Sequence, residues 1–529
     1  MIRSEETDVL IVGGGPVGLA LSLDLTYRGV RHVMIDAGDG VVRHPKVSTV
    51  GPRSMEHFRR WGVADRIRAA GWPLDHPLDI AWVTRVGEHE IYRFERGTAA
   101  DRPVFRHTPE PDQVCPAHLL NPVLADAVGV HPEGPARYRC RLEHFRQDAD
   151  GVRATISSGG EEHVVSARYL VACDGSSSPV RKALGIEAPA RHETQVFRNV
   201  LFRAPDLPAR LAERGHRTAL VYFLMHSPSL RYPLRSLDGR GLYNLVVDGR
   251  SGQDTMALIR SAIACDVPVE PVSDGAWHLT HRVADRYRAG RVFLAGDAAH
   301  TLPPSGGFGM NTGIGDAADL GWKLAAAVAG WAGDGLLDTY ETERRPVAID
   351  SLDAAGENLR RTLDRDLPAD LAADTEQGVA LRAEMAGRLA KGGARDEFDA
   401  PGVHFGFHYR SPIVVADGPV EPAPRWRPGS DPGSRAAHAW VRAGVSTLDL
   451  FGRGFTLLCF AGSPVLATFG ETFDERGVPY EPVFVDDPEI AKLYGRPFVL
   501  VRPDGHVAWR GHDLESGPAG LADVVRGAA

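Results

Sequence analysis

The sequence predicts an α/β protein with a parallel-sheet domain first, a mixed sheet inserted into it, and a smaller domain at the end. Three observations predict this fold class. Within residues 8–36, a strand, a glycine-rich turn, a helix and a second strand follow one another. Between residues 194 and 277, the pattern changes to successive strands. After residue 393, short apolar runs separated by turns indicate another sheet.

The opening stretch DVLIVGGGPVGLALSLDLTYRGVRHVMID predicts a nucleotide-binding unit. Its branched apolar run predicts a buried parallel strand, and Gly13, Gly15 and Gly18 give the G-x-G-x-x-G spacing. Such glycines allow a tight turn and close backbone approach to a pyrophosphate at the helix N-terminus. Asp36 ends the second strand, where an acid would accept hydrogen bonds from a ribose. We therefore expect a Rossmann-like dinucleotide site.

Composition limits the partners and the compartment. The 529 residues allow two or three domains, and 43% of the residues are hydrophobic. The net charge is −9, and the sequence contains no long run of basic residues that could follow a phosphate backbone. The five cysteines lie far apart without a C-x-x-C pair, which argues against a disulfide framework and a zinc site. No apolar run approaches the ~18 residues of a membrane helix, and the first strand leaves no room for a signal peptide. We expect a soluble, cytoplasmic protein without nucleic-acid, membrane or metal partners.

A loop and an amphipathic helix follow the first unit, in HPKVSTVGPRSMEHFRRWGV. Two cations there, Lys46 and Arg53, lie just past the nucleotide fold, from which either could reach a phosphate or ribose. Further along, the pattern predicts strands within 78–94, a helix over 119–128 and a hairpin over 138–156. The apolar stripe of the amphipathic helix is expected in the core and comprises Met55, Phe58 and Trp61.

The second motif, ARYLVACDGSSSPVRKALGI, contains a buried strand, an Asp-Gly turn and a short helix. Asp174 and Gly175 form the turn, and Ser178 is placed to cap the helix that carries Arg181. Such a turn is common on its own, and it becomes specific only beside the amino-terminal dinucleotide fold.

The third motif is RVFLAGDAAHTLPPSGGFGMNTGIGDAADLGWKL. A buried strand over 292–295 turns at Gly296 and Asp297, and a proline and glycine loop leads to a helix starting near Met310. Asp297 is placed to accept hydrogen bonds from a chain of hydroxyl groups, and the helix N-terminus offers N–H groups to negative charge. His300 is either a base or a histidine packed at the turn. A helix with paired charges over 336–346 closes this segment.

The inserted sheet is predicted from strands over 196–202, 218–225, 230–234 and 241–247. One face of this antiparallel sheet can cover a cavity. Strand side chains alternate, so Arg231 and Arg235 share a face and suit an anionic substrate. The alternative for either arginine is a solvated face or a structural ion pair.

The motifs GGGPVG, CDGSSSPVR and GDAAHTLPPSGGFGMN, in this order, resemble those of FAD-dependent aromatic hydroxylases with the para-hydroxybenzoate hydroxylase fold. The resemblance covers residues 1 to about 350. It implies that the glycine motif and Asp36 hold the ADP half of FAD, that Asp297 holds the ribitol, and that residues 303–311 line the isoalloxazine. NAD(P)H is the implied reductant, and oxygen the implied co-substrate for hydroxylation. The remaining implied cofactor residues are Lys46, Asp174, Arg181, Pro304, Gly307, Gly309, Met310 and Asn311.

The resemblance also implies a domain plan. The FAD-binding domain comprises 1–75, 100–190 and 280–350, and the substrate-binding sheet domain comprises 76–99 and 191–279. Residues 351–392 form a helical connection, and 393–529 resemble a thioredoxin-like domain. Without a C-x-x-C pair, this last domain is expected to be structural or dimer-forming rather than a dithiol catalyst. Its predicted strands are 446–450, 455–460, 480–485 and 498–502, with a hairpin around Asp504 and Gly505.

Stretches such as GPRSMEHFRRWGVADRI, TQVFRNVLFRAP and SPSLRYPLRSLDGRGLY resemble the flavoenzymes of indolocarbazole biosynthesis almost end to end. This resemblance implies action beside a haem monooxygenase on a carboxylated intermediate derived from chromopyrrolic acid. The rebeccamycin type leads to an imide, and the staurosporine type leads to a lactam. Rebeccamycin-type enzymes carry Phe and Arg at the positions of Val221 and Asn244, so the resemblance favours the staurosporine type. Substrate contacts are expected from Arg235 and Arg231, and the cavity wall from Asn244, Val221 and Trp277.

Three alternatives stay open. One is rebeccamycin-type oxygenation to the imide, and another is a binding protein that promotes decarboxylation with little flavin turnover. The third is a general NAD(P)H-dependent aromatic or polyketide hydroxylase. No side chain is assigned as catalytic.

Two departures from the family pattern concern the flavin. The family usually has arginine at the position of Lys46 and glutamine at that of Ala117. Lysine lacks the planar bidentate fork of arginine, and alanine offers no hydrogen bond. Losing both contacts would weaken FAD binding by about 1–3 kcal/mol, so we expect FAD to be held loosely.

Overall fold

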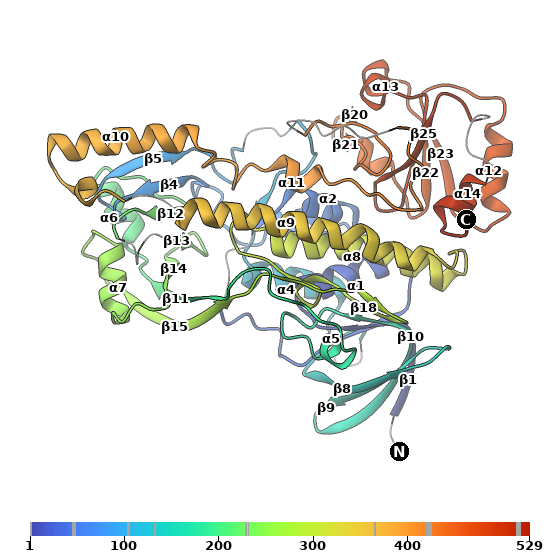
Figure 1. Ribbon diagram of the computed structural model, residues 1–529, viewed down its shortest axis with the longest axis horizontal. Coiled ribbons are helices and arrows are strands. Elements are labelled where there is room, and N and C mark those ends of the chain that lie inside the picture. The colour runs from blue at the N-terminus through green and yellow to red at the C-terminus, as the bar shows by residue number, and fades with distance from the viewer. Residues whose placement is uncertain are drawn as a thin grey trace.

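The computed structural model describes residues 3–44, 49–102, 106–131, 134–227, 230, 232–363, 367–418, 426–514 and 520–529. Lys46 and Arg231, two of the predicted site residues, lie outside these ranges. Two large sheets and a smaller carboxy-terminal sheet lie along the molecule, with the long helices α8 and α9 between them (Figure 1).

The first sheet is built on the predicted nucleotide-binding unit. Its strand order is β17-β18-β10-β1-β2-β7, and neighbours from β18 to β7 run parallel. The predicted hairpin over 138–156 is confirmed by antiparallel β8 and β9, which extend the sheet beside β10. The strands are β1 (Arg3–Val12), β2 (His32–Asp36), β7 (Ala136–Tyr138), β8 (Cys140–Gln147), β9 (Val152–Ser158), β10 (Glu161–Ala172), β17 (Arg288–Ala289) and β18 (Val292–Leu294).

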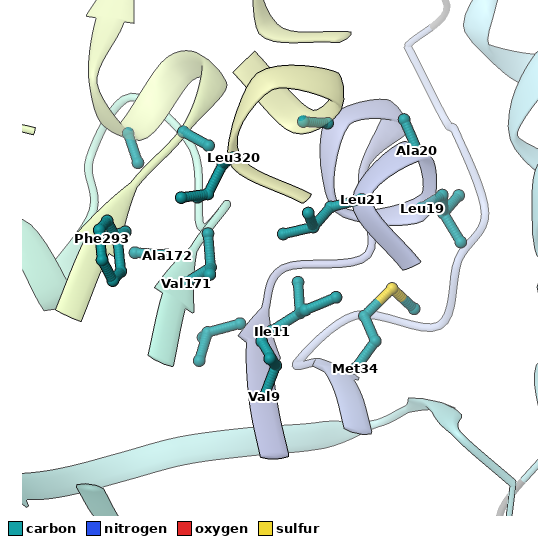
Figure 2. Close-up of a cluster of buried hydrophobic side chains, with 14 of the residues drawn as sticks. Val9, Ile11, Leu19, Ala20, Leu21, Met34, Val171, Ala172, Phe293 and Leu320 are labelled. Atoms are coloured by element: carbon teal, nitrogen blue, oxygen red, sulfur yellow. The ribbon is translucent and has the colours of Figure 1, made fainter. Parts of the chain in front are cut away.

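Helices α1 (Pro16–Arg28) and α8 (Phe308–Ala329) pack on each other and on this sheet. Figure 2 shows Leu21 of α1 and Leu320 of α8 above the strands that carry Ile11 and Val171, and all four side chains are fully buried. Helix α4 (Ala117–Val128) packs against α1. This core holds the carboxyl ends of β1 and β10 next to the N-termini of two helices, which is the usual place for a nucleotide.

The second sheet has the strand order β15-β11-β14-β13-β12-β4-β5. One face packs under α6 (Leu207–Glu213) and α7 (Thr255–Ala262), and part of the other packs against α10 (Glu376–Lys391). The predicted strand 230–234 is wrong at its start, because β13 begins only at Pro233, where pairing with β12 starts. The strands are β4 (Ile80–Val83), β5 (Glu90–Phe94), β11 (Gln195–Arg203), β12 (Val221–Leu224), β13 (Pro233–Ser236), β14 (Leu242–Asp248) and β15 (Glu270–Leu279).

The predicted helix over 336–346 is too short. A 3-10 turn over Leu336–Asp338 leads into α9 (Thr339–Leu363), which continues through Pro346. One lost backbone hydrogen bond is tolerated because the residues flanking Pro346 are buried, among them Arg344 and Val347, and α9 packs on α8. Shorter elements complete this part, namely β3 (Thr49–Val50), β6 (Gln113–Val114), β16 (Arg282–Val283), β19 (His300–Thr301), α2 (Pro52–Arg60), α3 (Ala64–Arg68), α5 (Pro179–Ala183) and α11 (Pro401–Phe405).

The carboxy-terminal sheet has the order β23-β22-β24-β25, with β22 and β23 parallel and the other pairs antiparallel. The hairpin predicted around Asp504 and Gly505 is confirmed. The strand predicted over 446–450 is wrong, since a capping box between Ser446 and Asp449 starts a 3-10 helix over Thr447–Leu450. The elements are β20 (Trp440–Arg442), β21 (Val445–Ser446), β22 (Phe455–Cys459), α12 (Leu466–Asp474), β23 (Tyr480–Phe484), α13 (Pro488–Tyr494), β24 (Phe498–Val501), β25 (Val507–Gly511) and α14 (Leu521–Val525).

Among the described residues, none of the helices has both the length and the apolar character needed to cross a membrane. In the same ranges, there is no cluster of three or more His, Cys, Asp or Glu side chains suited to a metal ion.

Candidate functional site

The three sequence motifs meet around one cavity, which we call the nucleotide cavity. It encloses about 1510 Å³ of empty space, including open solvent at its mouth. The glycine turn contributes Gly15, the second motif contributes Cys173 and Gly175, and the third contributes Asp297. Its other lining residues include Val17, His44, Ala117, Trp277, Thr280, Leu302, Pro303, Pro304, Gly307, Gly309 and Met310.

The three motif glycines have different roles. Gly13 has a φ of +116°, and a Cβ there would lie 2.2 Å from the carbonyl oxygen of Cys173. A Cβ on Gly18 would lie 1.9 Å from the carbonyl oxygen of Gly13, so this glycine lets α1 pack on the turn. At Gly15, a Cβ would meet nothing within 4 Å, and the backbone there borders the nucleotide cavity. The open backbone at the start of α1 fits a pyrophosphate group.

Asp36 links the second strand to the glycine turn. Its Oδ2 accepts a hydrogen bond of 2.6 Å from the N–H of Gly14, and its Oδ1 accepts one of 2.6 Å from Gly38. Each oxygen retains a further lone pair for a ribose hydroxyl. Asp36 is half-buried and is not among the residues that line the nucleotide cavity.

Asp297 is exposed toward the nucleotide cavity, in a 3-10 turn over Gly296–Ala298. Arg181 supports this turn, because its Nη1 donates to the carbonyl of Ala298 at 2.7 Å and its Nη2 to that of Ser176 at 3.1 Å. The predicted cap is confirmed, since the Ser178 hydroxyl accepts from the N–H of Arg181 at 3.0 Å. Arg181 therefore holds the loop that carries Asp297 and does not itself line the cavity.

Asp174 lies between the lining residues Cys173 and Gly175 in the chain but does not itself line the cavity. Its Oδ2 accepts from the N–H of Val180 at 3.1 Å, and burial raises the pKa of its carboxyl group. Its Oδ1 has no hydrogen-bond partner among the described residues. These contacts hold the second motif against the start of α5.

His300 belongs to a buried network rather than to the cavity surface. Its Nε2 lies 2.8 Å from Oδ2 of Asp316, whose Oδ1 accepts from Nε of Arg344 at 2.9 Å. Burial raises the pKa of Asp316, but the charges of His300 and Arg344 lower it overall. Oδ2 of Asp316 also accepts from the N–H of Gly296 at 3.1 Å. These contacts favour the packed role for His300.

Asn311 fastens the start of α8 to the start of α2. Its Oδ1 accepts hydrogen bonds of 2.7 Å from the N–H of Gly51 and from the Ser54 hydroxyl. Its Nδ2 donates to the carbonyls of Thr49 and Gly307, at 2.9 and 2.7 Å. With its amide group fully engaged, Asn311 positions the loop predicted to line the isoalloxazine.

A second large cavity, which we call the substrate cavity, lies beyond this loop and encloses about 1530 Å³ with its open mouth. Pro304 and Gly307 line both cavities, so a cofactor and a second molecule could meet there. A smaller cavity of about 430 Å³ contains Arg235 and Trp277. The remaining walls of the substrate cavity include Thr49, Pro52, Arg96, Arg106, His107, Thr108, Asp112, Val221, Arg235, Asn311, Glu397, Phe398, His404 and Phe405.

Three predicted substrate residues lie side by side. Arg235 on β13 pairs with Val221 on β12 and with Asn244 on β14, so the three share one face of the sheet. Val221 and Arg235 line the substrate cavity, and Asn244 flanks them one strand away. Trp277 stands between the smaller cavity and the nucleotide cavity.

The Arg235 guanidinium has no hydrogen bond or ion pair within the described ranges. Burial lowers its pKa, and the nearby carboxylate of Glu397 raises it. A half-buried cation at a cavity wall suits a carboxylate ligand. The sequence patterns did not single out Glu397, His404 or Phe405, because these residues follow a helical connection and carry no recognisable motif.

Comparisons with known proteins agree with this geometry. Residues 6–355 match the family described as FAD binding domain, and residues 430–528 match the family described as aromatic-ring hydroxylase, C-terminal. The chain belongs to the FAD-binding aromatic-ring hydroxylases. Among curated members of this hydroxylase family, the tetracenomycin A2 monooxygenase-dioxygenase of Streptomyces glaucescens is 34% identical, with 98% of this chain and 96% of that protein covered.

Two solved structures are more similar still. The rebeccamycin biosynthetic enzyme RebC with reduced flavin is 60% identical over 100% of both chains, with a TM-score of 0.95. Chromopyrrolic acid-soaked RebC with bound 7-carboxy-K252c is also 60% identical over 100% of both chains, with a TM-score of 0.96. The hydroxylase fold and the FAD-dependent enzyme class predicted from the motifs are therefore confirmed.

Proposed function

We propose that this hydroxylase acts in indolocarbazole biosynthesis, beside a haem monooxygenase, on a carboxylated intermediate derived from chromopyrrolic acid. The observation that carries the proposal is the Arg235 guanidinium, which is half-buried at the substrate cavity and has no carboxylate paired with it within the described residues. A substrate carboxylate would complete its ion pair. The 60% identity to RebC, solved with 7-carboxy-K252c, supports the same class of ligand.

The proposed product is the lactam aglycone of the staurosporine type. Asn244 adds no charge next to Arg235, and Val221 leaves room on the same face of the sheet. A rebeccamycin-type site would place Arg and Phe there, with a second cation and a smaller space. On this sheet face, a single cation therefore favours recognition of one substrate carboxylate.

FAD, when bound, supplies electron transfer to oxygen, and NAD(P)H is the proposed reductant. The glycine turn and Asp297 are proposed to hold FAD, and Pro304 and Gly307 to separate it from the substrate. Arg235 orients the substrate carboxylate, while Val221 and Trp277 limit how the aromatic rings lie.

The carboxy-terminal domain, with strand order β23-β22-β24-β25, is proposed to be thioredoxin-like, and its Cys459 is buried and unpaired.

The decisive experiment incubates the protein with the haem partner and chromopyrrolic acid, with and without FAD and NAD(P)H, and measures lactam and imide. We expect lactam as the main product and a loss of yield without flavin. An unchanged lactam yield without flavin would support the binding protein that promotes decarboxylation. NADPH consumption on simple phenols, without conversion of the indolocarbazole, would support a general aromatic hydroxylase.

We also propose that FAD is held loosely. Ala117 lines the nucleotide cavity with a methyl group only, where the family usually offers an amide. Ala117→Gln should tighten FAD binding by about 3- to 10-fold, since one hydrogen bond contributes about 0.5–1.5 kcal/mol. Titration monitored by flavin fluorescence measures this change, with Asp126→Gln at the exposed far end of α4 as the control. Full retention of flavin by the wild-type protein during dialysis would contradict loose binding.

A further inference from the structure

We propose that Arg435, in the carboxy-terminal part of the chain, is a positioning residue that holds together three walls of the substrate cavity. The proposal rests on the function proposed above for this cavity. Arg435 does not line the cavity, but the contacts of its guanidinium group described below reach segments that do.

The first wall is the start of α2. The Nε of Arg435 donates to Oε2 of Glu56 at 2.9 Å, and its Nη2 donates to Oε1 of the same carboxylate. Glu56 lies one turn after Pro52, which lines the substrate cavity together with Gly51. This bidentate pair therefore fixes the helix whose first residues form the wall.

The second wall is the segment around His107. The Nη2 of Arg435 also donates to the carbonyl of His107 at 3.0 Å. The Thr108 hydroxyl donates to Oε1 of Glu56 at 2.6 Å. Because His107 and Thr108 both line the substrate cavity, one guanidinium and one carboxylate join this segment to α2.

The third wall is the end of α11. The guanidinium carbon of Arg435 lies 4.6 Å from the ring centroid of Phe405, which lines the substrate cavity. Trp426 packs against the same residues, with ring centroids 5.3 Å from Phe405 and 5.2 Å from His107. Arg435 therefore touches all three walls at the point where they meet.

The burial of this pair argues for a positioning role. The side chains of Arg435 and Glu56 are 1% and 3% exposed, although they are 379 residues apart in the chain. Burying two charges is costly unless geometry and further hydrogen bonds compensate. Here Glu56 also accepts from Nη1 of Arg53 at 2.9 Å, and Nη2 of Arg53 donates to the carbonyl of Asp504 at 2.9 Å. The network thus connects the carboxy-terminal hairpin to the cavity walls.

Lysine at this position would keep the charge but would lose the planar fork. A single ammonium group cannot reproduce the parallel contacts with Glu56, the His107 carbonyl and the Phe405 ring. The walls would then shift relative to one another, and affinity would fall for any ligand that fills the cavity, whether or not it carries a carboxylate. This outcome differs from that of a direct carboxylate contact, which affects only carboxylated ligands.

The test compares Arg435→Lys with Arg510→Lys, a control whose arginine pairs with Asp417 and Asp431 at 2.6 Å and, within the described part of the chain, contacts no residue that lines the substrate cavity. Dissociation constants are measured for chromopyrrolic acid and for K252c on the FAD-loaded protein, together with hydrogen exchange of segments 51–56 and 106–110. We expect about tenfold weaker binding of both ligands and faster exchange of both segments in Arg435→Lys only. Unchanged affinities together with unchanged exchange would overturn the proposal.

A milder variant, Thr108→Val, removes the hydroxyl contact to Glu56 together with the contacts of the same hydroxyl to the backbone of Glu110. Exchange of segment 51–56 is therefore its diagnostic readout, and it should rise less than in Arg435→Lys. This milder variant replaces Arg435→Lys if the latter unfolds, and unchanged exchange of segment 51–56 in folded Thr108→Val would then overturn the proposal. If the wild-type protein binds neither ligand, the proposed function fails. The exchange measurement, which needs no ligand, then decides the role of Arg435 by itself.

Discussion

Arg235 of β13 and Asn244 of β14 lie opposite each other in antiparallel register, so a cation and a neutral amide stand together on the sheet face that holds Val221. Cross-strand neighbours of this kind have Cβ atoms about 5 Å apart, close enough to contact one bound group. The charge of the site at this point therefore depends on a single residue next to Arg235.

Arg235→Met should weaken binding of chromopyrrolic acid by about 10- to 100-fold, because a buried charge-assisted hydrogen bond contributes about 1.5–3 kcal/mol. Binding of K252c, which lacks the 7-carboxy group, should change little if the Arg235 guanidinium recognises a substrate carboxylate. Equilibrium titration of both ligands measures the difference, with the exposed Arg240→Met as the control. Equal losses for the two ligands would contradict a carboxylate contact.

The double variant Val221→Phe with Asn244→Arg should shift the product from lactam toward imide. The new guanidinium adds a second cation beside Arg235, and the phenyl ring narrows the same face. Product analysis with the haem partner gives the ratio. Asn199→Arg is the matched control, because Asn199 pairs with Val246 on the same sheet, two residues along β14 from Asn244. An unchanged ratio in the double variant would remove the basis for assigning the lactam branch.

Gly15→Ala and Gly18→Ala should separate cofactor binding from folding. A Cβ on Gly15 meets open space, and the backbone there has an ordinary extended conformation, so thermal stability without FAD should stay near that of the wild type. Its FAD affinity should fall, since the methyl group enters the space proposed for the pyrophosphate. Gly18→Ala should lower the free energy of unfolding by more than about 2 kcal/mol, because its Cβ would clash with the Gly13 carbonyl. Thermal melts measure the stability of both variants, and flavin titrations measure their FAD affinity. A Gly15→Ala variant that is destabilised but binds FAD normally would contradict the assignment of Gly15 to the pyrophosphate site.

Acid should destabilise the protein partly through His404. Burial lowers the pKa of His404 to about 4, so between roughly pH 6.5 and pH 4 the unfolded chain binds a proton that the folded chain does not. Stability is therefore lost as the pH falls through this window. His404→Gln should reduce the loss between pH 7 and pH 5 by about 2 kcal/mol, as measured by urea unfolding. The exposed His512→Gln is the control, and an equal slope in His404→Gln would refute this account.

Much of the site could be predicted because its signals are local. The glycine turn and the Ser178 cap each depend on residues close in sequence, whereas Val221 was named only through the family resemblance and its pairing with Arg235 appears only in the structure. The predictions for Lys46 and Arg231 concern positions outside the described residues. Arg53, for which the sequence left a cofactor contact open, reaches Glu56 and the Asp504 carbonyl, since its direction depends on a hairpin far along the chain.

The sequence alone predicted a dinucleotide site, because the spacing of glycines and the turns after buried strands specify it within short segments, and the resemblance of the three motifs to FAD-dependent aromatic hydroxylases indicated the enzyme class. Only the tertiary structure decided which side chains complete the substrate cavity. Glu397, His404 and Phe405 return to it after the long helix α9, and Arg435 meets Glu56 across 379 residues. Contacts at such separations arise from the packing of whole elements and leave no periodic pattern in the sequence.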